Sequence, residues 1–254
     1  MLRNITMRKL VRLSVLASVS AAAVGGLASP GHAAQTSTVR ILQGALIYTG
    51  TSGFNDVLVF QSGGKIHVSD ATPITPGPGC TSVSTKIVTC TSPSVVLGTL
   101  GAGNDRFSTT VALGGGVSGQ DGDDLFLGGR ASGTSRLTYD GGNGFDTVSY
   151  ALSTAAVKVS LNGLSDDGRS GDQDRVAVDA IIGSSYGDVL TGNDNNNTLN
   201  GGRGRDTLNG GGGADLLLAN DGSADASLNC GQGSDTARVD ATDPFGHNCE
   251  TVVR

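Results

Sequence analysis

The chain has 254 residues, with 17 lysines and arginines against 23 aspartates and glutamates, so its formal net charge at pH 7 is −6. An acidic surface does not suit nucleic acid or anionic lipid, because both partners require basic patches. With 41 glycines, no tryptophan and 4% aromatic residues, the chain cannot build a large conventional core. We therefore expect metal and disulfides to supply stability that apolar burial does not.

Residues 1–33 have the features of a secretory signal peptide. Four basic residues stand before an alanine-rich apolar stretch, small residues follow, and we place cleavage after Ala33. A membrane anchor is the alternative, but the apolar run is short and no second long run exists. Removal of the peptide leaves 13 basic against 23 acidic residues, a net charge of −10. The sequence predicts a secreted, extracellular protein without a membrane span.

Residues 34–97 are predicted to form a small β-rich amino-terminal module. Short β-branched or alternating runs occur at 45–48, 57–60 and 65–68, and glycine, serine and asparagine turns separate them. This pattern is typical of β-hairpins.

The four cysteines of an exported chain indicate two disulfides. Three connectivities are possible, and we expect the local one. Cys80 and Cys90 flank an apparent hairpin, and Cys230 and Cys249 bracket the final segment. A CxxC redox or zinc site is the alternative, but it lacks the spacing and the histidine partners.

Residues 98–182 are predicted to form an irregular β-solenoid region. Isolated glycine-rich units occur at 101–107, 119–126 and 141–148, and they contain Asp105, Asp124 and Asp146. A further strand is expected at 157–161. The acidic loop 166–174 either binds a cation or is solvated.

Residues 201–218 contain two consecutive nonapeptides, each with glycine at positions one, two and four, aspartate at six and leucine at eight. The glycines permit a tight turn in which backbone carbonyls crowd a cation, and the aspartate supplies a hard oxygen ligand. The last three residues form a short strand, and Leu208 and Leu217 point inward. A disordered linker is the alternative, but it has no reason to place an apolar residue at every ninth position.

The frame continues upstream through Asn197 and Asp188, and downstream through Asp225 and Asp235. This pattern resembles the repeats-in-toxin (RTX), or haemolysin-type, calcium-binding family, and the layout resembles secreted actinobacterial members. The resemblance implies an all-β fold, a parallel β-roll or β-solenoid, with residues 183–254 as the calcium-binding roll and its disulfide-closed end.

The resemblance also implies that a calcium ion lies between two turns on the same side of the roll. The pairs carried over to this sequence are Asp188 with Asp206, Asn197 with Asp215, Asp206 with Asp225, and Asp215 with Asp235. Asp124 and Asp146 are further candidate ligands. Asp105 has no neighbour in frame, so we expect its removal to change calcium binding little.

Catalytic motifs are nearly absent. The chain after residue 33 has two histidines, His67 and His247, and the G-x-S-x-G match at 183–187 lies inside the repeat frame. We expect a non-enzymatic binding or structural protein that folds on calcium outside the cell. Two alternatives remain: an extracellular hydrolase that uses the roll for export and folding, and a surface adhesin whose outward threonines and asparagines contact polysaccharide or a cell-envelope partner.

Overall fold

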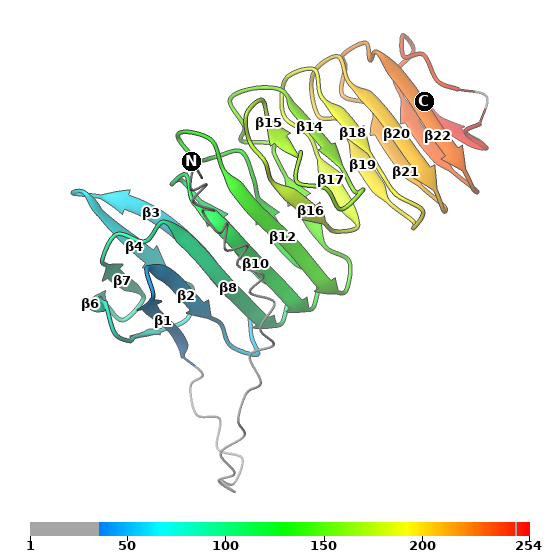
Figure 1. The fold of residues 1–254 in the computed structure, drawn as a ribbon. Helices are drawn as coiled ribbons and strands as arrows, with labels where there is room; N and C mark the ends of the chain where they lie inside the picture. Colours follow the sequence, from blue (N-terminus) through cyan, green and yellow to red (C-terminus); the bar gives the residue numbers. More distant parts are fainter. Residues whose placement is uncertain (1–35, 247) are drawn as a thin grey trace, which may run out of the picture. The chain divides into compact units, whose positions relative to one another are not determined.

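A computed structural model describes residues 36–246 and 248–254, which contain 24 strands and no helix (Figure 1). Residues 34–254 form one compact unit. The predicted all-β class is therefore confirmed. In the described residues, no helix is long and apolar enough to cross a membrane. The predicted signal peptide, residues 1–33, lies outside the described residues.

The strands belong to three sheets. The 12-stranded sheet has the order β24 (Thr251–Val253), β23 (Thr236–Val239), β21 (Leu216–Ala219), β19 (Thr198–Asn200), β17 (Ala180–Ile182), β13 (Thr147–Ser149), β11 (Leu125–Leu127), β9 (Arg106–Thr109), β3 (Asp56–Ser62), β4 (Lys65–Ser69), β7 (Ile87–Cys90) and β6 (Cys80–Ser84). The 7-stranded sheet has the order β16 (Arg175–Ala177), β12 (Arg136–Asn143), β10 (Gly114–Asp121), β8 (Val95–Ala102), β2 (Ala45–Thr49), β1 (Ser37–Leu42) and β5 (Ile74–Pro76). The 5-stranded sheet has the order β15 (Gly168–Arg169), β14 (Val157–Ser160), β18 (Val189–Thr191), β20 (Thr207–Gly212) and β22 (Ser227–Gln232).

Consecutive nonapeptides alternate between two sheets. Thr198 pairs in parallel with Leu216 in the 12-stranded sheet, and Val189 pairs in parallel with Thr207 in the 5-stranded sheet. One coil therefore takes 18 residues, which is two nonapeptides, and each strand stacks on its equivalent in the preceding coil. Figure 1 shows β14, β18, β20 and β22 side by side in this way. The arrangement is a parallel β-roll.

The core consists of apolar side chains that point inward from both faces of the roll. Leu199 and Leu217 come from the 12-stranded sheet and Leu190 and Leu208 from the 5-stranded sheet, and all four are fully buried. The predicted inward orientation of Leu208 and Leu217 is therefore confirmed. Burial of a leucine side chain stabilises by roughly 1.5–3 kcal/mol, and the stacked columns repeat this contribution at each coil.

The strands of residues 34–97 continue the roll. β2 pairs in parallel with β8, and β3 pairs in parallel with β9, so the module forms the first coil. The domain boundary predicted at residue 97 lies inside β8. The hairpins β1–β2, β3–β4 and β6–β7 are antiparallel, as predicted, and they cover the end of the stack. At this end the short strands β5 and β6 form the outer edges of the two sheets, and a short edge strand offers few unpaired backbone groups to another chain.

Both predicted disulfides are confirmed. Cys80 bonds to Cys90 across the β6–β7 hairpin, and Cys230 in β22 bonds to Cys249 just before β24. The second bond fixes the carboxyl-terminal segment against the last coil. Beside β22, the Gly246 N–H donates to the Leu228 carbonyl oxygen over 2.9 Å, so this edge is covered as well.

Candidate metal centre

A column of carboxyl and amide side chains follows the 12-stranded sheet, at the residue that precedes each strand. We call it the first ladder; its members are Asn55, Asp105, Asp124, Asp146, Asp179, Asn197, Asp215, Asp235 and Glu250. The N–H of one member donates to the side-chain oxygen of its equivalent in the next coil. Examples are Asp124 to Asp146 at 2.9 Å and Asp215 to Asp235 at 2.8 Å. Between Asp179 and Asn197 the pattern changes, and Asn197 Nδ2 donates to the Asp179 carbonyl oxygen over 3.3 Å.

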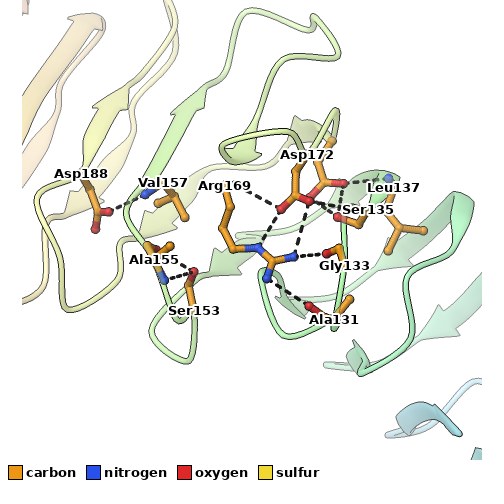
Figure 2. Close-up of polar contacts among 11 residues, drawn as sticks. Ala131, Gly133, Ser135, Leu137, Ser153, Ala155, Val157, Arg169, Asp172 and Asp188 are labelled. Atoms are coloured by element: carbon orange, nitrogen blue, oxygen red, sulfur yellow. Dashed lines mark hydrogen bonds and ion pairs between the residues drawn. The ribbon is translucent and has the colours of Figure 1, made fainter.

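A second ladder follows the 5-stranded sheet on the opposite side of the roll. Its members are Asp188, Asp206, Asp225 and Asp243, and it begins where the Val157 N–H donates to Asp188 Oδ1 over 2.7 Å (Figure 2). The N–H groups of Asp188, Asp206 and Asp225 donate to the next member over 2.8, 2.9 and 3.0 Å. The four residue pairs that the family resemblance implied are thus neighbours in the two ladders.

One oxygen of most ladder aspartates has no hydrogen-bond partner. Oδ1 accepts the N–H of the preceding coil, whereas Oδ2 is buried and unpaired in Asp105, Asp124, Asp206, Asp215, Asp225 and Asp235. A buried carboxylate oxygen without a donor is costly, because it has lost water and gained nothing. A bound cation removes this cost.

Glycines keep the space beside these oxygens open. A Cβ atom added to Gly201 would overlap Asp206 Oδ2, and one added to Gly210 would overlap Asp215 Oδ2. Backbone carbonyl oxygens of the adjacent turn lie against the other glycines, such as Ser184 O against Gly202. The space between turns is therefore lined by carboxylate and carbonyl oxygens, the ligand types that calcium prefers.

The electrostatics of the ladders also favour a cation. Burial, with repulsion from neighbouring aspartates, raises the pKa of Asp206 and Asp105 to about 7. Burial raises the pKa of Asp124, Asp215 and Asp225 to about 6, and it raises the pKa of Asp146 and Asp188 as well. In each case the charged form is disfavoured, which a divalent ion in the same space reverses.

All of the predicted candidate ligands lie in the ladders: Asp188, Asn197, Asp206, Asp215, Asp225, Asp235, Asp124 and Asp146. The expectation that Asp105 is isolated is wrong. Asp105 accepts from the Asn55 N–H and donates its own N–H to Asp124, both at 2.7 Å. Upstream coils contain 19 or more residues per turn of the roll, so the aspartates are neighbours in space although they leave the nine-residue frame.

The sequence prediction missed several ladder members, namely Asp179, Asp243, Glu250 and the amide Asn55. Three of the four missed residues, Asn55, Asp179 and Glu250, stand two positions before an inward apolar residue, such as Ile181 after Asp179. The local signal is an acid or amide, then any residue, then an apolar residue. It identifies these three ladder members even where the nine-residue spacing is absent. Asp221 was also missed, and its position is described below.

In the acidic loop 166–174, Asp166 is exposed, whereas Asp167, Asp172 and Asp174 are buried and hydrogen-bonded. Arg169 Nε donates to Asp172 Oδ2 over 3.0 Å, and the same guanidinium donates to the carbonyl oxygens of Ala131 and Gly133 (Figure 2). The Ser135 N–H donates to Asp172 Oδ1 over 2.7 Å. Both oxygens of Asp172 are already bonded, so this part of the loop fastens residues 131–137 to the next coil.

Comparison with known families agrees with this geometry. Residues 179–223 match the RTX calcium-binding nonapeptide repeat, in four copies. Such repeats imply calcium binding and a β-roll, and the oxygen-lined spaces between the turns of this chain fit calcium. Among curated proteins, no relative matches the chain.

Proposed function

We propose that this chain is an exported calcium-binding protein that folds on calcium outside the cell and serves as a binding or structural protein. The observation that carries the proposal is the set of buried, unpaired Oδ2 atoms in the two ladders. Residues 1–33 have the composition of a signal peptide, and two disulfides are typical of oxidising compartments. Calcium in such compartments is abundant enough to load sites of modest affinity.

Without calcium, the stacked carboxylates repel one another and the roll opens. Extracellular calcium modules bind in a range of about 10⁻⁴ to 10⁻³ M, and we expect the folding transition there. Circular dichroism of the full chain, first in chelator and then during a calcium titration, tests this. We expect strand signal to appear with calcium, and magnesium at equal concentration serves as the control. An unchanged strand spectrum in excess chelator contradicts calcium-dependent folding.

The described residues contain one histidine, His67, and its contacts support the proposed non-enzymatic role. His67 lies in β4, its ring stacks on Phe60 with 5.1 Å between centroids, and Nε2 lies 3.3 Å from the Ser62 carbonyl oxygen. The G-x-S-x-G segment forms the turn between β17 and β18, where Ser184 Oγ donates to Asp188. These contacts support structural roles. A hydrolase needs a nucleophile and a base that bond to each other, so assays with ester and peptide substrates test the alternative.

A second candidate function is adhesion to an uncharged polysaccharide through the outer face of the 5-stranded sheet. Asn229 Nδ2 donates to Asn209 Oδ1 over 2.9 Å, and Asn248 Nδ2 donates to Asn229 Oδ1 over 2.5 Å. The same row continues through Thr191, which pairs with Asn209. These bonds order a line of amide and hydroxyl groups that matches a hydroxyl-rich polymer. Sedimentation with insoluble polysaccharide tests it: Asn209→Ala with Asn229→Ala abolishes binding, and Thr198→Ala with Asn200→Ala, on the opposite face, does not.

A further inference from the structure

The turn at 220–225 differs from the turns of the two complete nonapeptides. It contains Asp221 at the second position, where the turns of the two complete nonapeptides have Gly202 and Gly211. The coil is also longer, because Thr207 pairs with Ser227, 20 residues away. The extra length and the acid at this position both depart from the nonapeptide pattern.

Three carboxylates meet at this turn. One oxygen each of Asp206, Asp221 and Asp225 lies within 4.8 Å of the other two. Asp206 and Asp225 are 0% and 3% exposed, and the Oδ2 atoms of all three residues are buried without a hydrogen-bond partner. Oδ1 of each residue is already bonded, for Asp221 by the Ser223 N–H at 2.6 Å. Each of the three residues therefore has one oxygen without a partner at the turn where the carboxylates meet.

Nothing in the described residues neutralises these charges. The ion pairs there are Arg106 with Asp56, Lys158 with Asp166 and Arg169 with Asp172, and none of them involves the cluster. Three buried carboxylate oxygens at this spacing repel one another strongly unless a cation lies between them. The neighbouring pairs in the ladders bring together two carboxylates, or one carboxylate and one amide, whereas this cluster brings together three carboxylates.

We propose that Asp206, Asp221 and Asp225 form a single divalent-cation site that binds calcium more tightly than the other spaces between turns and fills first. The inference rests on the proposed calcium function and adds to it a ligand outside the repeat pattern. Affinity of calcium sites rises with the number of charged ligands, so the third carboxylate is the cause of the difference. The site joins the coil of β20 to the coil that Cys230–Cys249 closes, so its loading orders the end of the roll before the rest.

Isothermal titration of the full chain with calcium, both disulfides intact, tests the inference. We expect two classes of site, with the tighter one at least about tenfold tighter than the other. Asp221→Asn keeps the size of the side chain and removes the charge, and we expect it to abolish the tight class and leave the weaker class. The matched control is Asp194→Asn, which removes the same charge from an exposed turn residue and should leave both classes.

The strand spectrum at saturating calcium shows whether Asp221→Asn still folds. Loss of the tight class with native strand content supports the inference. The inference is overturned if Asp221→Asn retains the tight class of sites, or if the unchanged chain shows a single class. Either result leaves the proposed calcium-binding function intact. Failure of the unchanged chain to take up any calcium overturns the proposed function and this inference together.

Discussion

The Asp105 N–H donates to Asp124 Oδ1 over 2.7 Å, across 19 residues of sequence. This bond places Asp105 in the same ladder as Asp215 and Asp235, far from the segment that matches the family repeat. Asp105 Oδ2 is buried and unpaired, like the Oδ2 atoms of those residues. The oxygen-lined column on this side of the roll thus extends well upstream of residue 179.

Asp105→Ala should destabilise the protein by about 1–3 kcal/mol, because the buried Asn55 N–H loses its acceptor. It should also reduce calcium uptake, as Asp206→Ala should in the second ladder. Urea unfolding and calorimetric titration measure the two effects. Asp194→Ala, at an exposed turn, is the control and should change neither. Equal behaviour of Asp105→Ala and the control would show that the upstream ladder holds no ion.

Gly201→Ala should lower calcium affinity and reduce the free energy of unfolding by about 1–3 kcal/mol, because the new methyl group overlaps Asp206 Oδ2. Gly53→Ala is the matched control, since a Cβ atom there meets nothing within 4 Å and the backbone is not left-handed. Calcium titration and urea unfolding of both variants separate crowding at the site from a general effect of replacing glycine. A Gly201→Ala variant with native affinity contradicts a cation beside Asp206.

Acid should stabilise the calcium-free roll. The pKa values of Asp105 and Asp206 are raised to about 7 in the folded protein, above the value of about 4 in an unfolded chain. Between these values the folded state binds more protons, so the free energy of unfolding falls as pH rises from about 4 to about 7. In calcium the trend should reverse, because protons compete with the ion.

Unfolding midpoints across this pH range, in chelator and in calcium, provide the measurement. We expect strand signal in chelator at about pH 4 to 5 and its loss near neutrality. A midpoint in chelator that does not move with pH contradicts the prediction. So does a shift of the same sign in both solutions.

Removal of either disulfide should cost roughly 3 kcal/mol on the chain-entropy model. The two bonds should differ in their effect on calcium. Cys230→Ser with Cys249→Ser frees the segment beside β22, so it should weaken calcium binding at the end of the second ladder. Cys80→Ser with Cys90→Ser is the comparison, and it should lower stability without changing affinity. Equal losses of affinity contradict the link between the carboxyl-terminal bond and the ladder.

Regular repetition explains what could be predicted from the sequence. A constant nine-residue step places Leu208 and Leu217 in the core and puts Asp188 beside Asp206 by arithmetic alone. Upstream, coils of 19, 22 and 33 residues carry loops of different length, so the step is lost although the strands still stack. Local pattern cannot reveal such stacking, because parallel pairing between distant strands depends on the whole sheet.

Two further features depend on contacts distant in sequence. Asp172 belongs to a loop that looked acidic and exposed, but the Ser135 N–H, 37 residues away, satisfies it. Asp221 belongs to a turn with an inserted residue, and its meeting with Asp206 requires the exact path of that turn. Neither partner lies within a local window of sequence.

The ladder bonds have a polarity that makes the two ends of the chain unequal. In nearly every step the N–H belongs to the earlier coil and the carboxylate to the later one. Removal of a coil at the amino end leaves a carboxylate oxygen, which water or an ion can satisfy. Removal of the last coil takes the carboxylate acceptor away from the preceding coil, whose N–H must then bond to water. Truncations of one coil at each end should therefore differ: the shortened carboxyl end loses order into the preceding coils, as amide hydrogen exchange would record, and the shortened amino end does not.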